Sequence, residues 1–305
     1  MLTKYSTGEL ITPAESNQPH SQQSGSGEDD LLTGKDSIVI ESSNFISSVD
    51  LASLWKCREL LYFLALRDIK IRYKQTLLGI AWVLLQPIVT TAIFTTIFLR
   101  LGTTQDLTVP YPLFAFSGFT LWTFINSAIT NCSGSLVNHS NLITKVYFPR
   151  LIIPFSAALA TLLDLVFGLT SLVIAMLIYG VVPGWRMLLL PLIIVPTLLL
   201  ALGIGIFTAA LNVKYRDVKY ILPFFIQIFF FISPVFYSLS MLPEESVALW
   251  QFNPLTGILE NFRALLFGLP FDFYSFGVSV TVSLLIFFAA IYTFHRLEDD
   301  FADVI

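Results

Sequence analysis

Long apolar stretches separated by short polar ones make up the chain from residue 77 onwards. A helix needs about 20 mostly apolar residues to cross the hydrocarbon core of a bilayer. Six stretches reach that length, and the Pro and Gly residues inside several of them are tolerated where neighbouring helices satisfy the backbone. The pattern predicts an all-α polytopic membrane protein with six transmembrane helices per protomer within 77–294. We expect the spans at about 77–99, 112–133, 150–179, 186–211, 220–241 and 275–294.

The segment 244–270, between the fifth and sixth predicted spans, has apolar residues at helical spacing but also carries Glu244, Glu245, Glu260 and Arg263. A charge at the centre of a bilayer costs at least ~2.5–3.5 kcal/mol, which disfavours a full span. We therefore predict short re-entrant helices that dip into the outer leaflet. Glu260 and Arg263 are three residues apart and could pair on one helix face.

The segment 51–76, directly before the first span, predicts an amphipathic helix that lies in the membrane interface. Aromatic and aliphatic residues share a narrow face, which we expect in the lipid, and bases would point to the headgroups. These interface residues are Trp55, Tyr62, Leu66, Arg67, Ile69, Lys70, Arg72, Tyr73 and Lys74. The helix could simply anchor the chain to membrane lipids, or it could present a docking surface to a cytoplasmic partner.

The first 50 residues are rich in Ser, Gly, Gln and Pro and contain no apolar region like that of a secretory signal. Such a composition buries too little apolar surface to order a chain. We expect residues 1–50 to form a disordered N-terminal extension.

The basic residues predict the orientation of the spans. Of the 17 Lys and Arg residues, all except Arg100, Arg186 and Arg263 fall on one side of a six-span topology. Because loops rich in Lys and Arg stay in the cytoplasm, both termini, including the tail 295–305, should be cytoplasmic.

The composition fits a membrane protein and gives no sign of an enzyme. The chain of 305 residues is 55% hydrophobic and 12% charged, whereas a soluble domain carries about 25% charged residues. Cys57 and Cys132 have neither a disulfide nor a metal-site spacing. The sequence Gly34-Lys35 is followed by Asp36 and lacks the upstream Gly of a phosphate-binding loop. We expect no catalytic residue, metal or cofactor in this chain, and no nucleic-acid partner.

Asp164 is an acidic residue deep inside the third predicted span. Ionisable groups inside a membrane are often functional, but this one could also hydrogen-bond to a neighbouring helix or to a second protomer. We expect no Lys, Arg or His at similar depth to pair with it, which argues against a proton relay.

Five sequence motifs occur in an order that resembles the permease subunits of type-2 ABC exporters. They are "RDIKIRYKQTLLGIAWVLLQP" from residue 67, "NLITKVYFPR" at 141–150, "LNVKYRDVK" at 211–219, "NPLTGILENFR" at 253–263 and "LEDDFADVI" at 297–305. The resemblance covers about residues 54–305 and is greatest to the bacterial branch that exports O-antigen, capsular polysaccharide and teichoic acid.

The resemblance implies a homodimer in the bacterial inner membrane, together with two copies of an ABC nucleotide-binding subunit that would hold ATP and Mg²⁺. The substrate would be a lipid-linked polysaccharide. Residues that would couple to the ATPase are Asn141, Leu142, Lys145, Tyr147, Phe148 and Pro149, with Tyr215, Arg216 and Asp217 in a second loop. The second loop could contact the ATPase, or an Arg-Asp pair there could merely hold a helix end.

A conduit for sugars should contain aromatic faces, on which the C–H surfaces of sugar rings can stack. Candidates for the conduit or its gate are Gln86, Phe94, Phe116, Trp122, Gln227, Phe230, Phe231, Tyr237 and Trp250. Any single Phe could instead face lipid or pack between helices. We expect the re-entrant helices to act as an outer gate.

Three other functions are open to this sequence. A type-2 ABC exporter of drugs or lipids would share the same architecture. A proton-driven flippase would need paired acids and bases in its spans and an inverted repeat. A membrane enzyme such as a lipid-sugar transferase would need acidic pairs or a metal cluster at the interface.

Overall fold

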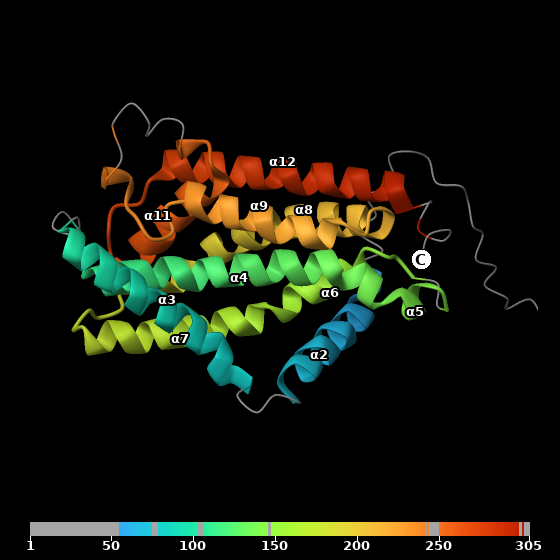
Figure 1. Ribbon diagram of the computed structural model, residues 1–305, viewed down its shortest axis with the longest axis horizontal. Helices are drawn as coiled ribbons and strands as arrows, with labels where there is room; N and C mark the ends of the chain where they lie inside the picture. The colour runs from blue at the N-terminus through green and yellow to red at the C-terminus, as the bar shows by residue number, and fades with distance from the viewer. Residues whose placement is uncertain are drawn as a thin grey trace, which may run out of the picture. The chain divides into compact units, whose positions relative to one another are not determined.

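The computed structural model describes residues 55–74, 79–102, 107–145, 148–241, 243, 250–298 and 301. Every regular element in this part of the chain is helical, as predicted (Figure 1). The predicted extension 1–50, Tyr147 and the acidic pair at 244–245 lie outside the described residues. The helices belong to one compact unit, Asn44–Ile305.

Eleven of the described helices form the apolar segments and the connections between them. They are α2 (Arg58–Lys74), α3 (Gly79–Leu101), α4 (Tyr111–Asn138), α5 (Ser140–Ile143), α6 (Ile152–Ala160), α7 (Leu162–Ile178), η1 (Trp185–Leu189), α8 (Leu190–Lys214), α9 (Val218–Ile232), α11 (Pro254–Phe267) and α12 (Phe273–Glu298). A short 3₁₀ turn, Leu239–Met241, follows α9.

Five helical segments of the described chain are long and apolar enough to cross a membrane. They are Val83–Leu101, Tyr111–Asn138, Ile152–Ile178, Trp185–Lys214 and Phe273–Glu298. Each matches one of the six predicted spans. The third consists of α6 and α7, which meet at Thr161, whose hydroxyl donates to the Ala158 carbonyl oxygen.

The predicted fifth span, 220–241, is shorter than expected, so the count of six is not confirmed. Helix α9 has 15 residues, or about 22 Å at 1.5 Å per residue, against a hydrocarbon core of about 30 Å. It ends because Ser233 is extended, with φ −98° and ψ 143°. Pro234 follows Ser233, and a proline disfavours the helical conformation in the residue before it.

Helix α4 lies at the centre of the bundle and contacts α3, α6, α7, α8, α9 and α11 (Figure 1). Of the 18 most apolar consecutive residues of α4, 78% are buried inside the protein, compared with 11% of the corresponding stretch of α3. Helix α8 packs against both α4 and α12. Gly205 permits this close approach, because a Cβ there would lie 2.6 Å from the Cβ of Cys132.

Helix α11 belongs to the core. Its Asn253 side chain caps the first turn by accepting from the Leu255 N–H at 3.0 Å. Its end at Gly268 has φ +73°, a left-handed conformation that suits glycine. All residues from Leu255 to Leu266 except Glu260 are buried. A helix enclosed in this way is a fixed part of the bundle.

Candidate functional site

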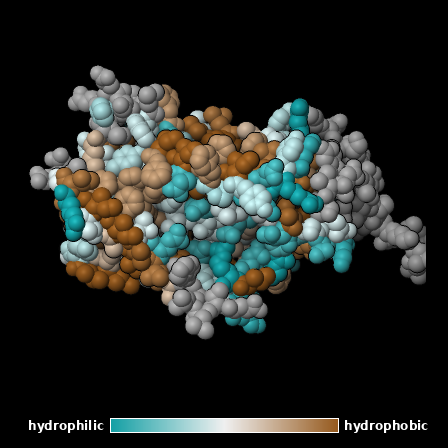
Figure 2. All heavy atoms as spheres, viewed as in Figure 1, coloured by the Kyte–Doolittle hydropathy of each residue, from teal (hydrophilic) through white to brown (hydrophobic). Residues whose placement is uncertain are grey.

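Most of the predicted functional residues belong to two groups, one towards each end of α4. We call these ends the α5 end, formed by the last turns of α4 and α12 with α2 and α5, and the α11 end, formed by the first turn of α4 with α11 and the end of α9. Figure 2 shows hydrophobic side chains over α3 and α7, and more hydrophilic ones over α2 and towards the α5 end. The two ends differ in chemistry, and each is described in turn.

At the α5 end, Asp164 in the first turn of α7 pairs with the last turn of α2. Arg72 Nη1 donates to Asp164 Oδ2, and the Tyr73 hydroxyl donates to Asp164 Oδ1. Asp164 is only 7% exposed, so its charge needs these partners. We call Arg72, Tyr73 and Asp164 the polar joint. The prediction that no base pairs with Asp164 was wrong, because α2 brings one from 92 residues away.

Tyr73 departs from its predicted place on a lipid-facing stripe. Its ring packs edge-on against Phe167 of α7, with centroids 6.1 Å apart. Burial raises the pKa of the Tyr73 hydroxyl well above its usual value, and the hydrogen bond to Asp164 raises it further. The hydroxyl therefore stays protonated and donates to Asp164 throughout the physiological pH range.

A second polar contact joins the middle of α2 to the end of α4. Arg67 pairs with Asp68 at 3.0 Å, and its guanidinium also contacts Nε2 of His139. His139 Nδ1 lies 2.7 Å from the Ser135 carbonyl oxygen. Because that oxygen can only accept, Nδ1 carries the hydrogen, and Nε2 of the neutral ring is free to accept from Arg67. His139 Nε2 is 3.8 Å from Asp68 Oδ1.

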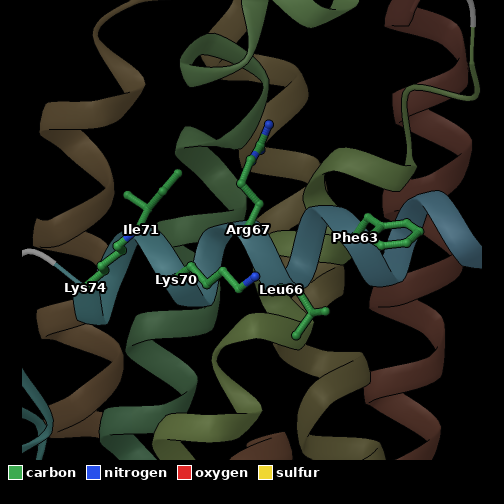
Figure 3. A pocket seen from close by; sticks show the side chains of 6 residues that line it. All are labelled: Phe63, Leu66, Arg67, Lys70, Ile71 and Lys74. Carbon is green, nitrogen blue, oxygen red and sulfur yellow. The ribbon is translucent and has the colours of Figure 1, made fainter.

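The outer side of α2 presents a groove of about 410 Å³ that mixes bases with apolar side chains (Figure 3). Its lining residues are Phe63, Leu66, Arg67, Lys70, Ile71 and Lys74. Elsewhere on this segment Trp55 is 71% and Tyr62 is 61% exposed. The groove mixes bases with apolar side chains, but the apolar residues of α2 are spread around the helix and do not form the single narrow face that was predicted. The predicted place of α2 in the membrane interface stays a prediction.

The segment predicted to couple to an ATPase is short and partly exposed. Asn141 and Lys145 are exposed, whereas Leu142 and Pro149 are half-buried. Phe148 packs against the core beside α6 and α12. Arg150 fixes the end of the segment by donating to the Glu298 carbonyl oxygen of α12. The exposed polar residues are thus presented from a segment held by its apolar side.

The loop between α8 and α9 exposes Tyr215, Arg216 and Asp217. Among the described residues, Arg216 and Asp217 form no ion pair with each other, and the Asp217 side chain does not cap α9. The structure therefore does not support the interpretation that an Arg-Asp pair holds this helix end. All three side chains are available to a partner.

At the α11 end, the ring of Phe236 lies among aromatic side chains from α3 and α9. The distance between ring centroids is 4.7 Å to Phe94 and 5.3 Å to Phe230. The ring centroid of Phe230 lies 5.2 Å from that of Trp122, and the ring centroid of Tyr237 lies 5.8 Å from that of Trp250. We call this set the aromatic cluster: Phe94, Phe98, Tyr111, Phe119, Trp122, Phe230, Phe231, Phe236, Tyr237 and Trp250.

Six of the nine predicted conduit residues belong to the aromatic cluster: Phe94, Trp122, Phe230, Phe231, Tyr237 and Trp250. The other three do not. Phe116 lines a separate groove of about 550 Å³ between α3, α4 and α7. Gln86 and Gln227 are exposed on α3 and α9. The central member, Phe236, was not among the predicted conduit residues, although its place two residues after a Pro at the end of a Phe-rich helix was a signal.

Arg263 is the largest fully buried side chain of the described chain. It donates to the carbonyl oxygens of Pro234 at 3.0 Å and Val235 at 2.6 Å. Its guanidinium lies 3.6 Å from the ring centroid of Phe114, and the predicted pair with Glu260 is present at 3.4 Å. Arg263 thus satisfies carbonyl groups that the break after α9 leaves without helical partners.

Two further side chains fasten α11 to its neighbours. Asn253 Nδ2 donates to the Ile232 carbonyl oxygen at 3.3 Å. Asn261 exchanges hydrogen bonds with the backbone of Asp272, at 3.0 and 2.8 Å. Asp272 in turn caps α12, and the hydrogen bond from the Ser275 hydroxyl lowers the pKa of its carboxyl group. Both the end of α9 and the start of α12 are therefore tied to α11.

The described fold and charge distribution define a polytopic helical membrane protein with a polar, partner-accessible end and an aromatic end. Residues 59–267 match the family of ABC-2 type transporters, and the chain belongs to that family. The predicted resemblance is confirmed at this level. Membership indicates the membrane subunit of a transporter rather than an enzyme, and it implies partnership with an ABC ATPase subunit.

Curated relatives cover almost the same part of the chain. The "O-antigen export system permease protein RfbA" of Myxococcus xanthus is 27% identical over 257 residues, which are 83% of this chain and 97% of that protein. A protein of the same name from Klebsiella pneumoniae is 25% identical over 252 residues, 81% of this chain and 95% of that protein. Another from Klebsiella pneumoniae is 25% identical over 249 residues, with the same coverage.

Proposed function

We propose that this chain is the permease subunit of an ATP-driven exporter that moves a lipid-linked polysaccharide of the O-antigen type out of the cytoplasm. The single observation that carries the choice of substrate is the aromatic cluster at the α11 end. The names of the curated relatives support the same substrate class.

The working assembly would be a homodimer with two ATPase subunits in the bacterial inner membrane. The α5 end faces the cytoplasm in this proposal, because Arg67, Lys70 and Lys74 lie on α2, Lys145 follows α5, and Lys214 ends α8. Both termini would be cytoplasmic. ATP and Mg²⁺ would be held by the ATPase subunit, so this chain would supply passage and coupling and perform no covalent chemistry.

The aromatic cluster would supply stacking surfaces to sugar rings that pass the α11 end. Trp122, Phe231 and Tyr237 are only partly enclosed by the rest of the chain, so a glycan could reach them at this end. Stacking is tolerant of the order of sugars, because it uses ring faces and needs no fixed pattern of hydroxyl groups. Such a surface suits a long polymer that must slide.

Opening during transport is assigned to the exposed faces of α3 and α9 rather than to a hinge in α11. Helix α11 is enclosed in the core and tied to α9 and α12 by Arg263, Asn253 and Asn261. In contrast, α3 buries little of its surface, and one face of α9 carries exposed Phe224, Phe225 and Ile228. Opening would therefore separate the exposed faces of α3 and α9 from a second protomer, and α9 and α11 would move together.

The polar joint gives little support to a proton-driven flippase. Arg72 lies on α2, outside the five apolar spans, and its pair with Asp164 ties α2 to α7. A relay would need further acids or bases along the spans, and the interior of the described spans holds no Asp, Glu, Lys, Arg or His beside Asp164.

Cross-linking to the ATPase tests the assembly part of this proposal. Cysteines would replace Asn141 and Lys145 in a chain in which Cys57 is changed to Ser, and the ATPase subunit would be co-expressed. Both sites should form cross-links to the ATPase. A cysteine at Leu188, which is 81% exposed on η1 at the other end of the spans, is the control and should form none. Equal cross-linking at Leu188, or none at Asn141 and Lys145, contradicts the orientation.

A further inference from the structure

Helix α2 is held at two points by side chains on one of its faces. Asp68 and Arg72 are four residues apart and therefore lie one turn apart on the same side. The first point, through Arg67 and Asp68, reaches His139, which is the N-cap of α5. The second point is the polar joint to Asp164. The helix thus connects the segment that would meet an ATPase with a transmembrane helix.

The polar joint lies at the end of α2 and at the start of α7. On the side of α2, Arg72 and Tyr73 are in its last turn, and α3 begins at Gly79. On the side of α7, Asp164 is two residues beyond the start at Leu162, directly after the junction with α6. A force on α2 would therefore act on the first span through the chain and on the third span through Asp164.

The chemistry of the joint favours a firm and directional contact. Both oxygens of the Asp164 carboxylate accept from α2, one from a guanidinium and one from a phenol. Charge-assisted hydrogen bonds of this kind are about twice as strong as neutral ones. Asp164 also lies at a helix N-terminus, where the helix dipole favours a negative charge. Losing either partner would leave a buried carboxylate half-satisfied.

We propose that α2 transmits displacement of the α5 segment to α3 and α7, and that Asp164, Arg72 and Tyr73 are the positioning residues that make this transmission possible. The proposal rests on the proposed function, because it presumes that an ATPase moves α5. It goes beyond that function by naming the contact through which ATP hydrolysis and the opening of the spans are coupled.

The test compares ATP hydrolysis with export in the complete permease–ATPase complex. Hydrolysis is measured on purified complexes in lipid nanodiscs, and export is measured as surface glycan in a deletion strain of the source bacterium that carries each variant. Asp164→Asn should keep hydrolysis within about twofold of wild type but lower the export-to-hydrolysis ratio at least about fivefold. Glu59→Gln, an exposed acid-to-amide change on α2, is the matched control and should change neither quantity.

Charge reversal separates a coupling role from a merely structural one. The double variant Arg72→Asp with Asp164→Arg should restore the ratio to within about twofold of wild type, whereas each single reversal should lower it. If Asp164→Asn does not assemble, Tyr73→Phe decides the matter, because it removes one hydroxyl and keeps the ion pair. A lowered ratio in assembled Tyr73→Phe supports the proposal, and an unchanged ratio contradicts it.

The outcomes distinguish this inference from the proposed function. If the wild-type complex exports no glycan, the proposed function is wrong whatever the variants do. If the wild type exports and Asp164→Asn exports as much per ATP hydrolysed, only the transmission role is overturned. Failure of the reversed pair in an assembled, hydrolysing complex also overturns it.

Discussion

Arg263 on α11 donates a 2.6 Å hydrogen bond to the carbonyl oxygen of Val235, three residues beyond the end of α9. This contact explains how a broken helix can exist inside the bundle. Carbonyl groups at membrane depth need internal partners, and a buried guanidinium with several fixed donors can satisfy two of them at once.

Replacing Arg263 by Met should destabilise the protein. The change leaves the Pro234 and Val235 carbonyl groups buried without a donor, at a cost of about 2–5 kcal/mol in the free energy of unfolding. Unfolding of the purified protein in mixed micelles measures the effect. Arg100→Met is the control, because Arg100 is exposed at the end of α3 and its loss should change stability little. Equal stability of the Arg263 variant and wild type would contradict the assigned role.

Adding a methyl group at Gly118 should be as disruptive as removing Arg263. A Cβ at this position of α4 would overlap the Val235 carbonyl group and lie 2.7 Å from a guanidinium nitrogen of Arg263. We expect Gly118→Ala to yield little folded protein in a size-exclusion assay. Gly277→Ala on α12 is the matched control, because nothing lies within 4 Å of its Cβ and Ala is favoured over Gly in a helix by about 1 kcal/mol. Equal yields of folded protein from the two variants would contradict this packing interpretation.

Phe236→Leu should separate the stacking role of the aromatic cluster from its packing role. Leu keeps most of the apolar contact with Phe94 and Phe230, so stability should fall by less than Phe→Ala would cost, about 3–5 kcal/mol. Export of glycan should nevertheless decrease if sugar rings use the cluster. Phe288→Leu, a half-exposed position on α12, should leave export unchanged. Normal export by Phe236→Leu would argue that the cluster only packs.

The cap on α12 should make stability depend on acidic pH. Because the Ser275 hydroxyl holds the pKa of Asp272 below its usual range, the capping contribution is fully present above the ordinary aspartate pKa of about 3.9. It is lost as pH falls through the lower, folded-state pKa. Asp272→Ala should therefore cost about 0.5–2 kcal/mol near pH 7 and less near pH 2. A cost that stays the same at both pH values, measured by unfolding in micelles, would contradict this.

The sequence predicts the local features of this fold well because they depend on local composition. Five long apolar runs form helices long enough to cross a membrane, and the Asn-Pro and Gly positions around 253 and 268 mark the limits of α11. The predicted fifth span is not confirmed, because α9 ends before Ser233, which precedes a Pro within the apolar run. Proline chemistry was visible in the sequence, but whether a membrane helix continues through it depends on its neighbours.

The contacts that define the two ends could not be predicted, because they join residues far apart in the chain. Asp164 and Arg72 are 92 residues apart, and Arg263 meets Val235 across 28. Helical periodicity gives the face of α2 but not the neighbour against which that face packs. Tyr73 was therefore assigned to lipid by its spacing, although a carboxylate on another helix determines its position.

The most direct test of the central claim is the fate of lipid-linked glycan when this gene is deleted in the bacterium that carries it. An exporter of this class predicts that surface glycan disappears, that lipid-linked glycan accumulates on the cytoplasmic side, and that the wild-type gene restores export while ATP is maintained and the proton gradient is collapsed. Unchanged surface glycan in the deletion strain, or export that stops when only the proton gradient is lost, would contradict the claim.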